Sequence, residues 1–126
     1  MNFTDVFRSI QETGGASFNV NTGELNPTTG YMVPISKNYE RKFAVPTNFH
    51  DFGIMFKAYM AEHWDHLLDS GYRTYIGFWI HERNLYVDLS ENIQDKLEAY
   101  RDGVERNQIA IYDCAKKEDI TIIHSV

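Results

Sequence analysis

The chain has 126 residues, of which 43% are hydrophobic, and this length and composition are typical of one globular domain with a single core. Eighteen acidic residues against twelve basic ones give a formal net charge of −6, which argues against direct nucleic-acid binding and favours basic partners. The single cysteine, Cys114, excludes an internal disulfide, and no apolar run reaches the roughly 20 residues of a membrane span, so we expect a cytoplasmic protein without membrane attachment.

The first third of the chain predicts a helix followed by two strands. Apolar residues from Phe3 to Ile10 recur at i, i+3, i+4 and i+7 and predict a helix that stops at Gly14 and Gly15. Residues 16–20 and 31–35 are both expected to be extended, and the turn formers between them favour a hairpin with a long tip. Pro34 lacks a backbone donor, which places the second strand at an edge or near its end.

The middle of the chain predicts the main helix and the main hairpin. Residues 36–46 have no usable periodicity and are expected to form an exposed basic loop. From Thr47 or Asn48 to about Asp69, apolar side chains recur every three or four residues and predict the long helix of the core. Residues 72–80 and 85–89 then predict two strands joined by a short turn.

The last third predicts one more helix and one more strand pair. Ser90 or Asn92 is expected to cap a helix that reaches about residue 107, and residues 108–112 and 120–123 are expected to be strands. The apolar stripe of this helix would be Ile93, Leu97, Tyr100 and Val104. The order α-ββ-α-ββ-α-ββ predicts a single α+β domain over residues 1–126, with a mostly antiparallel sheet packed by helices.

A row of carboxylates is the strongest charged pattern. These residues follow each other at +4, +3, +4 and +3 along the third predicted helix, opposite its apolar stripe: Glu91, Asp95, Glu98, Asp102 and Glu105. Acids spaced by one helical turn resemble a row of phosphates and could occupy the basic groove of a nuclease. The alternative is a solvated outer face, whose charge Arg101 and Arg106 partly offset.

The sequence contains no recognisable catalytic or metal-binding constellation. His63 and His66 share one side of a helix and could take a metal with His50, but no second helix repeats the pattern, so we expect a hydrogen-bonded histidine at the core boundary and no metal. Cys114 has His124 ten residues away without a surrounding motif. We therefore assign no catalytic residue and no cofactor.

Aromatic residues outside the predicted core are candidate contacts for a partner. Tyr39, Arg41 and Lys42 interleave basic and aromatic side chains, as single-strand nucleic-acid binders do, but the three cations of residues 36–46 in an acidic chain favour a solvated loop or the rim of a protein interface. Trp79 is expected at an interface if one face of the sheet is open.

Several strings resemble a group of small hypothetical proteins that bacteriophages, plasmids and integrative elements carry. The strings are GGASF at 14–18, GYMV at 30–33, YVDLS at 86–90 and ERNQIAIYD at 105–113. The resemblance implies a mobile-element setting, in which short acidic proteins often inhibit host defence, including anti-CRISPR and anti-restriction proteins. It implies no catalytic or metal-binding residue.

Together these features lead to the hypothesis of a host-defence inhibitor that works by binding, with a Cas nuclease effector as partner. The expected contacts are the carboxylate row, Tyr39, Arg41, Lys42 and Trp79, and the chain could be a monomer or a homodimer. Two alternatives stay open. One is a small enzyme acting on a nucleotide or nucleic acid through His63, His66 or Asp113, and the other is an accessory protein that contacts DNA.

Overall fold

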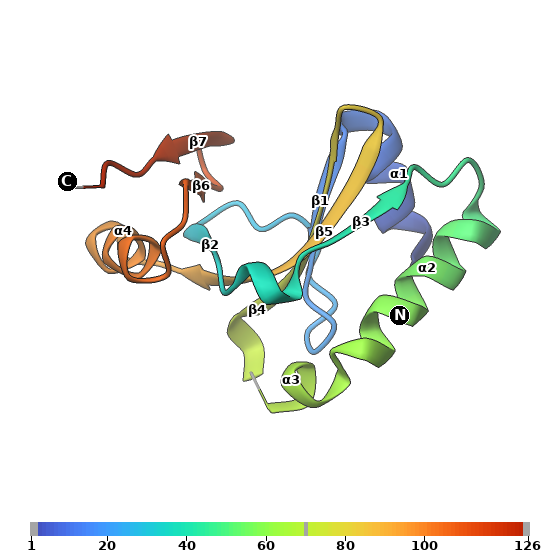
Figure 1. The fold of residues 1–126 in the computed structure, drawn as a ribbon, viewed down its shortest axis with the longest axis horizontal. Coiled ribbons are helices and arrows are strands. Elements are labelled where there is room, and N and C mark those ends of the chain that lie inside the picture. Colours follow the sequence, from blue (N-terminus) through green and yellow to red (C-terminus); the bar gives the residue numbers. More distant parts are fainter. Residues whose placement is uncertain (1–2, 70, 125–126) are drawn as a thin grey trace.

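A seven-stranded sheet organises the chain in the order β1-β4-β5-β2-β6-β7, with β3 as a further partner of β5. The computed structural model describes residues 3–69 and 71–124 (Figure 1). All strand pairs are antiparallel, so the predicted α+β class with an antiparallel sheet is confirmed. The elements are α1 (Phe3–Thr13), β1 (Gly15–Phe18), β2 (Tyr31–Pro34), η1 (Lys37–Tyr39), β3 (Arg41–Ala44), α2 (Phe49–Glu62), α3 (Trp64–Asp69), η2 (Gly71–Arg73), β4 (Thr74–His81), β5 (Asn84–Ile93), α4 (Lys96–Glu105), β6 (Ala110–Asp113) and β7 (Glu118–Thr121).

Strand β5 is the centre of the sheet. It pairs with the whole length of β4, from His81 opposite Asn84 to Thr74 opposite Glu91, and the sequence predicts this hairpin. Near its start β5 also pairs with β3, and near its end with β2. The two turn residues between β4 and β5 have positive φ, 49° at Glu82 and 68° at Arg83, which is the geometry that joins twisted antiparallel strands without splaying them.

The helices divide the buried side chains into two main clusters. α1 and α2 pack on the odd-numbered residues of β5, where Leu85, Val87 and Leu89 are fully buried beside Phe52 and Phe56. A smaller cluster lies under α4, against β2, β6 and the end of the chain: Val33, Ile93, Ala99, Ile111 and Ile122. In Figure 1, α4, β6 and β7 lie at the opposite end of the molecule from α2.

The predicted hairpin between β1 and β2 is wrong. β1 pairs with β4, whereas β2 pairs with β5 and β6. The turn formers of residues 19–30 close a loop of their own, because the Asn19 side chain accepts hydrogen bonds from the Asn21 and Thr22 amides and donates one to the Tyr72 carbonyl. Pro34 is the last residue of β2, near the strand end as expected.

Two further predictions need correction in the middle of the chain. The expected loop 36–46 contains η1 and the strand β3, which pairs with β5 from Arg41 opposite Val87 to Ala44 opposite Asn84. The expected single helix is divided, since α2 ends at Glu62, His63 is its C-cap and α3 follows at once. The predicted cap Asn48 is confirmed, and its side chain accepts a hydrogen bond from the Asp51 amide.

The fourth helix begins later than predicted. β5 continues to Ile93, and Asp95 rather than Ser90 or Asn92 caps α4. The predicted apolar stripe is also wrong, because Leu97 is 81% exposed and α4 instead packs through Ala99 and Gly103. In the described residues, no helix is long and apolar enough to cross a membrane.

Candidate functional site

Glu91, the first residue of the predicted carboxylate row, does not lie on the helix that carries the others. Glu91 belongs to β5, not to a helix, and it forms ion pairs with Arg73, at 3.4 Å, and with Arg106. Asp95 is the N-cap of α4, and its Oδ2 accepts a hydrogen bond of 2.9 Å from the Glu98 amide. The Glu91 carboxylate is therefore already paired within the protein, and the Asp95 carboxylate caps the helix.

The remaining carboxylates follow α4 in one line, which we call the acidic row: Asp95, Glu98, Asp102 and Glu105. Asp102 is 17% exposed and lies within 4 Å of Arg101 and Arg106. Among the described residues, Glu98 and Glu105 form no ion pair. The acidic row therefore keeps uncompensated charge at Glu98, which is half-buried, and at Glu105, which is exposed.

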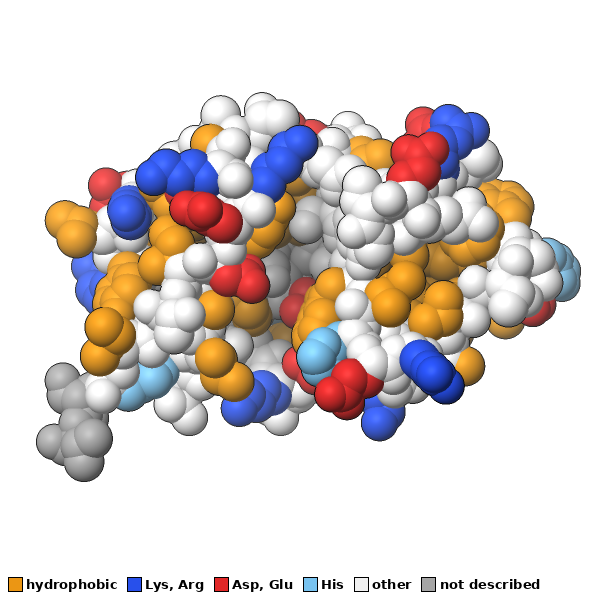
Figure 2. Space-filling model, turned by 90° about the horizontal axis from the view of Figure 1, so that it is seen from above, with side chains coloured by type: hydrophobic (Ala, Val, Ile, Leu, Met, Phe, Trp, Pro, Cys, Tyr) orange, Lys and Arg blue, Asp and Glu red, His pale blue; other side chains and the backbone are white. Residues whose placement is uncertain are grey.

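Exposed hydrophobic side chains lie around the same helix. We call them the α4 apolar patch: Leu97 (81% exposed), Val104 (40%), Ile109 (74%) and Ile123 (81%). Leu97 and Val104 are two turns apart on one side of α4, and the Ile123 amide donates to the hydroxyl of Tyr100 between them. Figure 2 shows hydrophobic side chains gathered at the end of the molecule where the chain ends. Sequence periodicity placed Leu97 and Val104 in the core, so this patch was missed.

The predicted basic and aromatic contacts of the β3 region are mostly engaged inside the molecule. Arg41 donates hydrogen bonds from Nε and Nη2 to both oxygens of the Glu62 carboxylate, the shorter ones at 3.0 and 2.9 Å, and this pairing lowers the pKa of Glu62. The ring of Tyr39 lies 5.3 Å from His63 and 4.9 Å from His66, measured between ring centres. Lys42 is the exposed member of this predicted group.

Trp79 lies on the sheet face opposite the residues that pack under α1 and α2, and this face is open at its position. It is 41% exposed, and its ring stacks on Tyr86 with centres 4.5 Å apart. Lys42 is in register with Tyr86 on the same face. Trp79 and Lys42 thus lie together, but on strands that do not include the acidic row.

Of the residues named for the enzymatic alternative, His63 and His66 both pack on the Tyr39 ring, whereas Asp113 lies on another element, β6. His63 is 7% exposed at the α2–α3 junction, and burial lowers its pKa. Asp113 is at the end of β6, where its Oδ1 accepts from the Ala115 and Lys116 amides. Within residues 3–69 and 71–124, no three His, Cys, Asp or Glu side chains are arranged to hold a metal ion.

Cys114 is buried, and it does not form a catalytic dyad with His124. Burial is the main reason that the pKa of Cys114 is raised to about 11, so its thiol stays protonated at neutral pH. His124 has its Nε2 2.8 Å from the Gln108 carbonyl oxygen instead.

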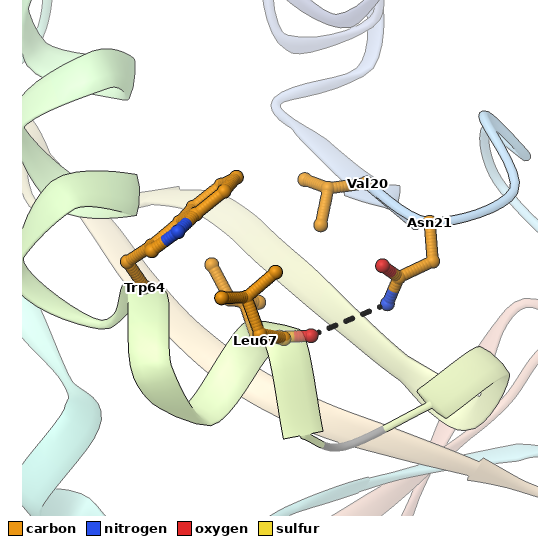
Figure 3. A pocket seen from close by; sticks show the side chains of 5 residues that line it. Val20, Asn21, Trp64 and Leu67 are labelled. Carbon is orange, nitrogen blue, oxygen red and sulfur yellow. Dashed lines mark hydrogen bonds between the residues drawn. The ribbon is translucent and has the colours of Figure 1, made fainter.

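A small hollow lies between α3 and the loop after β1 (Figure 3). Val20, Trp64, Leu67 and Leu68 line it with Asn21, whose Nδ2 donates to the Leu67 carbonyl over 3.4 Å. Its volume of about 50 Å³ is far below that of typical ligand pockets. We therefore regard it as a packing defect at the surface.

The fold and these surfaces define an α+β domain whose helix α4 carries exposed Leu97 and Val104 beside carboxylates. Comparison of the chain with models of protein families, with curated proteins and with solved structures finds no match.

Proposed function

We propose that this protein is a binding protein that inhibits a nuclease, and that α4 is its contact surface. The observation that carries the proposal is that exposed Leu97 and Val104 lie on the same helix as the uncompensated carboxylates of Glu98 and Glu105. Apolar side chains can form the desolvated centre of an interface, and carboxylates beside them attract a basic surface and speed association.

The partner of this proposal is a Cas nuclease effector. Nucleases present basic grooves to phosphates, and a net charge of −6 with carboxylates along one helix is complementary to such a groove. The resemblance of four sequence strings to proteins of phages, plasmids and integrative elements supports host defence as the target.

Binding can be measured directly with purified Cas effectors. We expect one effector to bind with an affinity that falls as salt rises, and its cleavage to be inhibited with saturation near one inhibitor per effector. Leu97→Ser should weaken binding about 10-fold, which corresponds to about 1.4 kcal/mol for an interface side chain of this size. Glu98→Gln with Glu105→Gln should flatten the salt dependence.

Matched controls lie away from α4. Leu68→Ser changes another exposed leucine, 58% exposed on α3, and Glu12→Gln changes an exposed acid on α1; both should leave affinity unchanged. The proposal fails if no effector binds, or if the α4 and control variants have equal effects. Inhibition far below one protein per target would instead support the enzymatic alternative.

A further inference from the structure

A hollow of about 430 Å³ lies where the acidic row begins, between the start of β4 and the N-terminus of α4. The lining residues are Tyr72, Arg73, Tyr75, Asn92, Ile93, Gln94, Asp95 and Glu98. Its volume is in the range of sites that hold a small ligand or a single large side chain.

The inner wall of the hollow is rigid because its polar groups are already paired. Tyr75 is 5% exposed, and its hydroxyl donates to the Glu24 carboxylate. Asn92 is 8% exposed; its Nδ2 donates to the Thr29 carbonyl over 3.0 Å, and its Oδ1 accepts from Gln94 Nε2. These groups shape the hollow and leave little capacity to bind a polar ligand themselves.

The free charge at the hollow is negative. Among the described lining residues Arg73 is the one cation, and the Glu91 carboxylate already lies 3.4 Å from its guanidinium. Glu98 forms no ion pair in the described residues, and Asp95 uses one carboxylate oxygen as helix cap. An anion would therefore meet two carboxylates, whereas a cation would find an unpaired one.

Tyrosine rings add a second kind of contact for a cation. Tyr72 is 76% exposed at the rim, and Tyr75 contributes to the wall. A guanidinium can stack on an aromatic ring and pair with a carboxylate at the same time, because it is planar and weakly hydrated. The compact, strongly hydrated ammonium of lysine is less suited to this combination.

We propose that this hollow binds an arginine side chain of the basic partner, paired with Glu98 and stacked on Tyr72. This inference rests on the proposed function and identifies the anchor within the α4 contact surface. The rest of the acidic row then attracts the partner, and the hollow selects arginine over lysine.

The test uses hexa-arginine and hexa-lysine peptides, which carry the same number of side-chain charges, and follows backbone amide shifts of the whole protein by NMR. Hexa-arginine should shift amides of residues 72–75 and 92–98 and bind several-fold more tightly than hexa-lysine. Glu98→Gln should weaken hexa-arginine about 5- to 10-fold, as expected for a charge-assisted contact. Tyr72→Ser should remove the preference for arginine.

Glu105→Gln is the matched control, because Glu105 belongs to the acidic row but does not line the hollow. It should weaken both peptides equally and by less than Glu98→Gln. The proposal is overturned if the two peptides bind equally, or if shifts are confined to the far end of α4. Neither result would contradict the proposal that a nuclease binds α4. Conversely, if hexa-arginine occupies the hollow but no Cas effector binds, only the proposed function is refuted.

Discussion

The pKa of Asp88 depends on the packing around its side chain in the sheet. Asp88 lies opposite Gly77 on β4, where a Cβ would come within 2.5 Å of the Asp88 carboxylate oxygen. Burial, with a smaller effect from Glu40, raises the pKa of Asp88 from 3.8 to about 7. The folded protein therefore holds a proton on Asp88 over a pH range in which the unfolded chain has lost it.

This difference predicts how stability depends on pH. Because the folded-state pKa is the higher one, the contribution of Asp88 is fully present below about pH 4 and is lost as pH rises to about 7. Asp88→Asn removes the titration, so the variant should gain about 1–3 kcal/mol relative to the natural protein between pH 4 and pH 8. Urea unfolding across this range measures the gain, and Glu40→Gln should shift the transition to lower pH. A constant difference between variant and natural protein would contradict the prediction.

The sequence shows which side chains can form ion pairs and ring contacts, but it does not show which partners they contact. Arg41 and Tyr39 are residue types typical of a binding loop, yet the Arg41 guanidinium is hydrogen-bonded to Glu62, which is 21 residues away along the chain. Glu91 has the spacing of the acidic row, yet β5 continues past it and pairs it with Arg73 and Arg106. Such partners depend on the tertiary fold, which local spacing does not contain.

At the level of elements, α1 and the β4–β5 hairpin were predictable because their patterns are local. The elements that were predicted wrongly have sequence patterns that are compatible with more than one structure. The stripe Ile93, Leu97, Tyr100 and Val104 has helical spacing, but Ile93 completes the alternation of β5 and α4 packs through its smallest residues. Similarly, the turn formers between β1 and β2 predict that these strands pair with each other. Their actual partners, β4 and β5, come later in the chain, and local sequence contains no signal for that pairing.

The same substitution at two helical glycines should have opposite effects, because Gly103 of α4 closely approaches β6 and Ile122, whereas Gly53 of α2 faces open space. A Cβ on Gly103 would lie 2.3 Å from Ile122 Cδ1 and 3.0 Å from Ile111 Cγ2, so Gly103→Ala should lower the free energy of unfolding by about 1 kcal/mol through overpacking. A Cβ on Gly53 in α2 would meet no atom within 4 Å, so Gly53→Ala should raise it by about 0.5–1 kcal/mol through helix propensity. Thermal or urea unfolding of both variants measures the difference, and equal signs would show that α4 is not held as closely as described.

Over the whole molecule, the two largest clusters of buried residues differ in size and position. The larger one joins α1, α2 and the β1-β4-β5 half of the sheet, whereas the smaller one holds α4 to β2, β6 and Ile122. β7 is at the edge of the sheet, and Ile109 and Ile123 beside it are largely exposed. The end of the molecule that carries the proposed contact surface is thus supported by fewer buried side chains, which favours local opening there.

Native-state hydrogen exchange should detect two levels of stability. Amides of α4, β6 and β7 should open with a free energy at least about 2 kcal/mol below that of β4 and β5, which makes them exchange about 30-fold faster. Ile111→Val, in the smaller cluster, should speed exchange in α4, β6 and β7 alone, because it removes about 1 kcal/mol from that cluster. Ile76→Val, in the larger cluster, should lower the free energy of global unfolding and speed the slowest amides of β4 and β5. If both variants change all amides equally, the protein opens as one unit, and a partner that binds α4 then contacts a surface as rigid as the main core.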